Sequence, residues 1–143
     1  MSLHFDDAAV RRLLRLEDLL PAMRRALMDL SAGRVFQPLR SVSDFPGGAG
    51  FLMLKPALTQ DALATKIITL FHGNAARGLP TMLATLVLMD PQTGQTLATM
   101  DATWLTALRT AAVSAVAADA LTPPGPKVVA MIGSGALART HAL

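Results

Sequence analysis

The feature that most constrains this chain is a glycine turn close to its end. Residues 127–132 are apolar apart from Lys127 and predict a short buried strand. They lead directly into Gly-Ser-Gly-Ala-Leu-Ala at residues 133–138, which has the spacing of a dinucleotide-binding turn. A turn of this kind joins the first strand of a Rossmann α/β fold to its first helix. The pattern therefore predicts that such a fold begins here.

Each small residue of the turn has its own physical role. Gly133 permits the tight turn, and Gly135 lets the backbone approach a pyrophosphate. Ala138 is small enough for close packing of the helix on the strand, and the helix N-terminus favours an anion. The alternative is an ordinary glycine loop between a strand and a helix, but the apolar strand before it favours the dinucleotide interpretation.

The predicted helix after this turn stops almost at once, because the chain ends at Leu143. A dinucleotide fold needs a full βαβ unit and an acidic residue about 20 residues further on that holds the ribose. We therefore expect a truncated chain, the front part of a protein that uses NAD or NADP. The residue that would distinguish these two cofactors lies outside it.

The composition favours one modest, packed domain. Of the 143 residues, 52% are apolar, and no apolar run is long enough to span a bilayer. Charged residues break up the N-terminus, so no signal peptide is visible. There is no cysteine, and the histidines lack metal-ligand spacing. We expect a cytoplasmic protein with no metal site and no membrane partner.

The net charge of +3 is mild, and the N-terminal arginines are the densest basic group. Their spacing is typical of a solvated helix face. Nucleic-acid binding would require a basic stripe with stacking aromatic residues or a known module, and the sequence shows neither. We expect no nucleic-acid partner.

The rest of the chain predicts an α+β region ahead of the glycine turn. Helical periodicity covers residues 6–14, 16–32 and 102–121, with Asp101 capping the last helix. Strand patterns cover residues 35–43, 50–54, 64–71, 81–90 and 95–100. We predict a substrate or dimerisation domain over residues 1–121, a proline-rich connector at 122–126, and the start of a Rossmann domain at 127–143.

Three basic residues stand in apolar or uncharged surroundings: Arg40, Lys66 and Arg109. None has an acidic neighbour in the sequence, and unpaired Lys or Arg is rarely buried. A cluster of such cations suits an anionic ligand, and arginine forks suit carboxylates best. Alternatively, each is an edge residue whose aliphatic stem lies along the core.

Three stretches together resemble the ornithine cyclodeaminase/mu-crystallin family. They are Lys-Ile-Ile-Thr at residues 66–69 with a following Asn74, Gly-Leu-Pro-Thr at residues 78–81, and Leu-Thr-Ala-Leu-Arg-Thr-Ala-Ala at residues 105–112. The glycine turn follows at the family's usual distance. The resemblance covers almost the whole chain.

The resemblance implies an NAD(P)-dependent enzyme that acts on α-amino or α-imino acids. Three activities are possible: that of a ketimine reductase, that of an amino-acid dehydrogenase, or that of a cyclodeaminase. A cyclodeaminase is a lyase. It also implies a homodimer that pairs its N-terminal sheets. By motif position, Arg40 and Arg109 resemble the arginines that bind the substrate carboxylate. Lys66 resembles the lysine beside the reacting carbon, and Thr110 resembles a residue near the cofactor phosphates.

The sequence also departs from the family pattern. Lys55 precedes Pro56 where relatives usually have Met, and Met82 and Leu83 stand where relatives often have His-Gln. The family's downstream aspartate lies outside the chain. Two other interpretations stay open: a non-catalytic, crystallin-like ligand-binding or dimerisation protein, and an inactive remnant.

Overall fold

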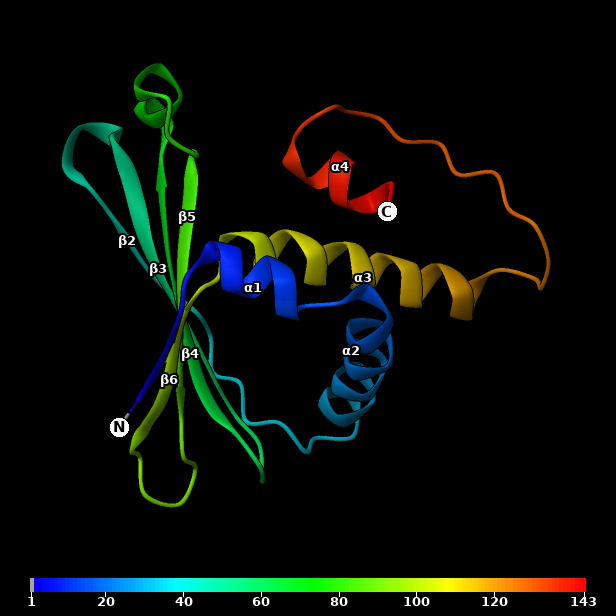
Figure 1. Ribbon diagram of the computed structural model, residues 1–143, viewed down its shortest axis with the longest axis horizontal. Helices are drawn as coiled ribbons and strands as arrows, with labels where there is room; N and C mark the ends of the chain where they lie inside the picture. The colour runs from blue at the N-terminus through cyan, green and yellow to red at the C-terminus, as the bar shows by residue number, and fades with distance from the viewer. Residues whose placement is uncertain (1) are drawn as a thin grey trace.

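The computed structural model describes residues 2–143, which form one mixed sheet with helices on one of its faces (Figure 1). The strands are β1 (Leu3–Phe5), β2 (Ser41–Asp44), β3 (Gly50–Leu58), β4 (Leu63–Phe71), β5 (Met82–Met89) and β6 (Thr96–Asp101). The helices are α1 (Asp7–Leu13), α2 (Leu16–Ser31), α3 (Thr103–Leu121) and α4 (Ala136–His141), with short 3₁₀ segments at Pro46–Gly48 and His72–Arg77. The predicted α+β class is confirmed.

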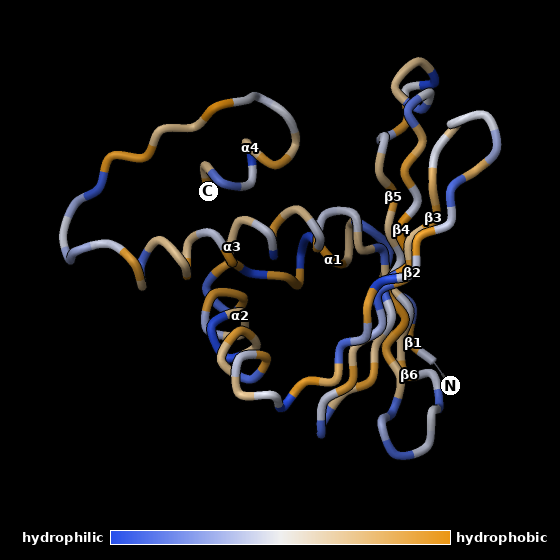
Figure 2. Tube along the Cα trace, turned by 180° about the vertical axis from the view of Figure 1, so that it is seen from behind, coloured by the Kyte–Doolittle hydropathy of each residue, from blue (hydrophilic) through white to orange (hydrophobic). Residues whose placement is uncertain are grey.

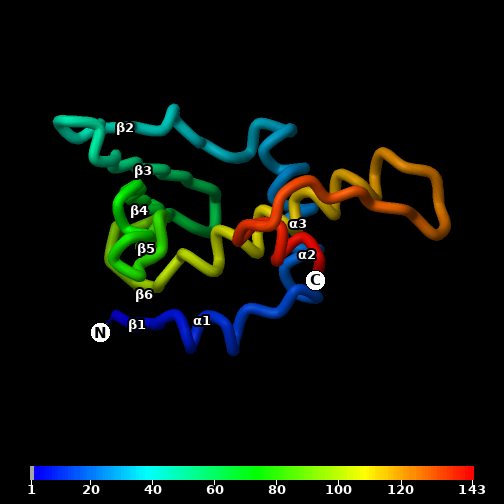
Figure 3. Tube along the Cα trace, turned by 90° about the horizontal axis from the view of Figure 1, so that it is seen from above, coloured from blue at the N-terminus to red at the C-terminus, as the bar shows by residue number. Residues whose placement is uncertain are grey.

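The sheet has the strand order β1-β6-β5-β4-β3-β2. All neighbours are antiparallel except β1 and β6, which are parallel. The strands form one layer with the helices beside it, as Figure 3 shows from above. Side chains alternate between the two faces of a strand, so every second residue of β3, β4 and β5 points toward the helices.

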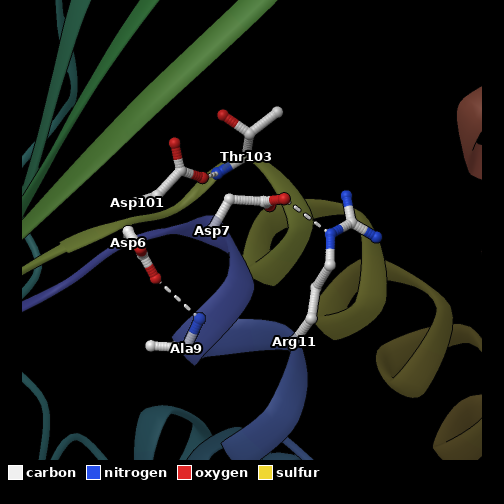
Figure 4. Close-up of polar contacts among 6 residues, drawn as sticks. All are labelled: Asp6, Asp7, Ala9, Arg11, Asp101 and Thr103. Carbon is white, nitrogen blue, oxygen red and sulfur yellow. Dashed lines mark hydrogen bonds and ion pairs between the residues drawn. The ribbon is translucent and has the colours of Figure 1, made fainter.

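Acidic side chains satisfy free backbone N–H groups at the start of two helices (Figure 4). Asp6 Oδ1 accepts a hydrogen bond of 2.7 Å from the amide of Ala9 in α1. Asp101 Oδ1 accepts one of 2.9 Å from the amide of Thr103, the first residue of α3, but Ala102 occupies the N-cap position, so Asp101 is not the cap that the sequence predicted. These hydrogen bonds fix where the chain leaves the sheet and enters each helix.

Helix α3 packs into two clusters of buried residues. One cluster joins Leu19 of α2 to Leu108 and Ala112 of α3. The other joins Ile68 of β4 and Ala84 of β5 to Ala102, just before α3. Ala102 and Ala112 are completely buried, and their small side chains allow close approach of the backbones. This packing anchors the start of α3 on the sheet and the middle of α3 on α2.

Two predicted strands have different bounds in the structure. The prediction for residues 35–43 was wrong in extent: Phe36 forms one bridge with Leu58, and β2 begins only at Ser41. Pro38 lacks an N–H group and interrupts the pairing between them. Conversely, β3 continues past the predicted end to Leu58. Strand β3 can include Pro56 because β2 pairs with β3 only as far as Leu54. No carbonyl group of β2 therefore requires an N–H group at Pro56.

The prediction of a strand over residues 127–132 was also wrong for this structure. These residues are extended but pair with no strand anywhere in residues 2–143. Val128 and Ile132 are fully exposed. The apolar character that predicted a strand is still visible along this arm in Figure 2. A parallel strand needs neighbours on which to form its backbone hydrogen bonds, and the sheet has none free beside this arm.

Helix α4 turns back and packs against α3. The Thr140 hydroxyl is buried and donates to the carbonyl oxygen of Ala107 at 3.3 Å. Ser114 Oγ and His141 Nε2 lie 3.0 Å apart. Ala138 therefore lies in a helix that packs on another helix, and the predicted packing on a strand is not formed. Across residues 2–143, no helix has both the length and the apolar character that a membrane span requires.

Substitution of Gly50 would test how closely β3 approaches β4. A Cβ atom at this position would lie 2.0 Å from the carbonyl oxygen of Leu70. We predict that Gly50→Ala lowers the free energy of unfolding by about 1–3 kcal/mol, the usual cost of forcing atoms into a packed region. Urea unfolding measures it, with Gly73→Ala as the control, because a Cβ atom at Gly73 would meet nothing within 4 Å. Equal stability of the two variants would contradict this account.

Candidate functional site

Lys66 lies in the middle of β4, on the sheet face that contacts the start of α3. Ile68, two residues further on, is buried in the core under α3, so strand alternation places Lys66 on the same face. Its Nζ donates a hydrogen bond of 3.1 Å to Oγ1 of Thr106, a buried residue in the first turn of α3. One end of the lysine side chain is therefore held by the helix.

Burial and neighbouring positive charge act together on Lys66. Burial, followed by the charges of Arg109 and Lys55, lowers the pKa of Lys66 to about 8. An ammonium group with this pKa exists in both protonation states near neutral pH, which suits a group that gives or takes a proton. Perturbation of this kind is more frequent at functional sites than elsewhere.

Arg109 lies one turn after Thr106 on α3. Its Nε is buried and has no hydrogen-bond partner in residues 2–143. The side chain lines a cavity of about 510 Å³ between α2, α3 and the chain around Gln37. A buried N–H group without a partner is unfavourable, and a carboxylate accepts hydrogen bonds from the guanidinium fork. The position therefore suits an anionic ligand.

Arg40 lies just before β2 and is exposed. With Lys55 of β3 it lines a second cavity, of about 360 Å³, to which Gln37, Pro38, Leu39 and Pro56 also contribute. Arg40 and Arg109 thus line different cavities, which adjoin at Gln37. Lys66 lines neither of them. The three predicted cations belong to one region of the fold without sharing one cavity.

The positive charges of this region influence one another. Burial, then Arg109 and Arg40, lower the pKa of Lys55, while Arg109 and Lys55 act on Lys66. None of these four cations forms an ion pair within the part of the chain that the structure describes. By contrast, Arg11, Arg15, Arg24 and Arg34 all pair with acidic residues. These four cations lie together where an anion would be stabilised.

Thr106 was not recognised from the sequence as part of the site. Its hydroxyl accepts from Lys66, and its carbonyl oxygen accepts a hydrogen bond of 2.6 Å from Thr110 Oγ1. The spacing of Thr106 and Arg109 was the available signal, since residues three apart share one face of a helix. Only the placement of α3 on the sheet shows that this face meets Lys66.

The glycine turn has the local features that a dinucleotide phosphate requires. Gly133 has a φ of 116°, which disfavours any side chain, and a Cβ atom at Gly135 would meet nothing within 4 Å. Gly135 precedes α4, whose first N–H groups receive no side-chain cap. Thr110 lies on α3 between Ala107 and Ser114, the positions that contact α4. These residues fit a pyrophosphate. Separately, residues 2–143 contain no group of three or more side chains that could bind a metal ion.

Lys66→Met tests the lowered pKa through stability. Below pH 8 Lys66 is charged in both the folded and unfolded states, so the cost of burying the charge is fully present. Between pH 8 and 10.5 the folded protein binds fewer protons than the unfolded chain, and stability rises with pH. We predict that Lys66→Met raises the free energy of unfolding at pH 7 by on the order of 1–2 kcal/mol. This gain is smaller than the free energy equivalent to the whole pKa shift, because solvent screens the side chain. The gain should vanish above pH 10.5.

Urea unfolding at several pH values measures this effect. Lys127→Met is the matched control, because Lys127 is exposed and contacts only a backbone carbonyl oxygen. A gain for Lys66→Met that does not change with pH would show that burial of the charge is not its cause.

Three comparisons place the chain among known proteins. The mouse ketimine reductase mu-crystallin is 41% identical over 128 residues, which are 86% of this chain and 41% of that protein. The structure of Thermococcus litoralis Δ(1)-pyrroline-2-carboxylate reductase with NADH and L-proline superimposes with a TM-score of 0.91 at 34% identity, covering 98% of this chain and 44% of that one. An archaeal alanine dehydrogenase dimer with bound NAD gives a TM-score of 0.93 at 30% identity, covering 99% and 43%.

The chain thus spans less than half the length of these relatives. The family model of the ornithine cyclodeaminase/mu-crystallin family matches residues 4–143. That match includes the lysine and arginines of the cationic region and the glycine turn. The chain belongs to the ornithine cyclodeaminase/mu-crystallin family.

Proposed function

We propose that the protein reduces α-imino acids with NADH or NADPH. The observation that carries this proposal is the lowered pKa of Lys66 beside the unpaired guanidinium of Arg109. Similar proteins support it: one is a ketimine reductase, and another is a pyrroline-2-carboxylate reductase whose structure holds NADH and L-proline. The chain has no cysteine and we propose a cytoplasmic location.

Arg109 and Arg40 bind the substrate carboxylate in this proposal. Two guanidinium forks fix both the position and the orientation of a carboxylate. The unpaired Nε of Arg109 then gains an acceptor, which removes the cost of its burial. Fixing the carboxylate also fixes the imine carbon next to it, so that reaction occurs in one geometry.

Lys66 supplies the proton that the imine nitrogen gains. An imine is reduced when its carbon accepts a hydride and its nitrogen accepts a proton, and the bound nicotinamide supplies the hydride. The Nζ of Lys66 gives its proton to the nitrogen and is then reprotonated from water. Thr106 fixes the direction of the Lys66 side chain through the hydrogen bond of 3.1 Å.

The cofactor would be held by Gly133, Gly135, Ala138 and Thr110. We retain this assignment because of the open glycine turn and the uncapped start of α4. We also retain the division into residues 1–121, 122–126 and 127–143, with the last segment belonging to the cofactor domain. The exposed apolar arm before the turn supports it, because such residues require cover from further strands.

We propose that the protein is a homodimer that pairs its sheets. The face of the sheet away from the helices carries apolar side chains that are partly exposed, including Leu54, Leu58 and Leu83. Figure 1 shows no helix over this face. One similar structure is described as a dimer with bound NAD. A second copy would cover these side chains.

The direct test of the proposed function uses the full-length protein. We predict that Lys66→Met lowers kcat for Δ(1)-pyrroline-2-carboxylate by about 10²–10⁴-fold, the usual contribution of a general acid. In the unaltered protein, kcat should fall as pH rises through about 8, because the proton on Lys66 is lost. The loss of reduced-nicotinamide absorbance measures both changes, with Arg77→Met, at an exposed residue after β4, as the control. Unchanged turnover in Lys66→Met would remove this residue from the reaction.

Arg109→Lys separates binding from the chemical step. A lysine keeps the charge but cannot form two parallel hydrogen bonds, so we predict that KM rises about tenfold to a hundredfold while kcat changes much less. The same steady-state assay measures it. Arg77→Lys is the matched control, because Arg77 is exposed on the 3₁₀ segment after β4. Binding of NAD(P)H without turnover of any imino acid would instead favour a non-catalytic ligand-binding protein.

A further inference from the structure

Lys55 is a cation of the site region that the proposed reaction does not use. It lies on β3 directly opposite Lys66 on β4. Residues opposite each other in an antiparallel pair point to the same face, with Cβ atoms about 5 Å apart. Because Lys66 reaches Thr106 of α3, Lys55 also points to the helix-covered face. Two ammonium groups thus stand side by side next to Arg109.

This arrangement is unfavourable without an anion. Like charges directly opposite each other destabilise a sheet. Lys55 has no ion-pair partner within residues 2–143, and the charges of Arg109 and Arg40 add to the burial that lowers its pKa. A single substrate carboxylate brings one negative charge to four cationic side chains. Arg109 and Arg40 take up that charge in the proposed function, so Lys55 remains without an anionic partner.

The space beside Lys55 can hold a second group of the same ligand. Lys55 and Arg40 line the cavity of about 360 Å³, and Arg109 lines the adjoining one of about 510 Å³. Gln37 lies between them because it lines both. A molecule bound at Arg109 can therefore extend past Gln37 toward Lys55. The end of the molecule that reaches Lys55 meets its ammonium group.

We propose that Lys55 determines substrate specificity by binding a second acidic group, so that the protein prefers α-amino or α-imino dicarboxylates over monocarboxylates. This inference rests on the proposed function, since it places the first carboxylate at Arg109. Lys55 contacts the side-chain carboxylate of the substrate, while Arg40 and Arg109 keep the first carboxylate. Lys66 remains free for the imine nitrogen.

Lys55 has one alternative role that the test must separate from this one. Its charge contributes to the lowered pKa of Lys66, so it could act only as a positioning residue that tunes the proton donor. Removal of Lys55 would then move the pH dependence of kcat and would affect acidic and neutral substrates equally. A specificity role instead predicts a change for acidic ligands alone.

The experiment compares L-glutamate with L-glutamine on the full-length protein. The two ligands have the same size and differ in the charge of the side-chain group. We expect L-glutamate to bind about tenfold or more tightly than L-glutamine, as for a partly desolvated charge pair. Lys55→Met should reduce this ratio to about one, and Lys55→Arg should preserve it. Arg77→Met, at an exposed cation outside the site region, should leave the ratio unchanged.

Isothermal titration calorimetry measures these affinities without requiring turnover. The preference for L-glutamate can therefore be tested even if the protein reduces no imine, so failure of the proposed function is distinguishable from failure of this inference. Thermal unfolding of each variant confirms that it is folded. Equal affinity of the unaltered protein for both ligands would overturn the inference, as would a Lys55→Met variant that keeps the preference and changes only the pH profile.

Discussion

The packing of α3 against the sheet is the contact on which the site depends. Ala102, Ile68 and Ala84 are buried together where the chain passes from β6 into α3, and their small or compact side chains bring helix and sheet close. As a result the first turn of α3 lies over β4, where Thr106 receives a hydrogen bond from Lys66. Arg109 follows one turn later on the same face. A looser contact would separate the lysine from its acceptor.

The electrostatics of the region follow from this geometry. Cations that lie far apart in the chain become neighbours, and burial strengthens their mutual repulsion because fewer water molecules screen them. The protein carries this cost without acidic partners around Lys66 and Arg109, although it supplies such partners to Arg11 and Arg24 elsewhere. Because the Nε of Arg109 is buried and Lys66 is partly buried, this unpaired charge lowers the stability of the fold, which favours a role in binding a ligand.

Most helices and strands could be predicted because their patterns are local. The helices at residues 16–32 and 102–121 and the strands at residues 64–71 and 81–90 agree closely with α2, α3, β4 and β5. Hydrophobic periodicity and capping residues depend only on neighbours in the chain. The strand β1 was missed because three residues are too few to show an alternating pattern. Residues 127–132 have a strand-like sequence, but pairing requires other strands that their own sequence does not supply.

The sequence by itself determined the family, the residue types of the site and the α+β class, because motif spacing and periodicity are properties of the chain alone. Only the tertiary structure decided which cations meet. It placed Lys55 opposite Lys66, put Arg40 and Arg109 in adjoining cavities, and gave Lys66 its partner Thr106. These relations depend on strand register and on where the start of α3 contacts the sheet. Register and this contact arise from the packing of many side chains at once, and no local pattern encodes them.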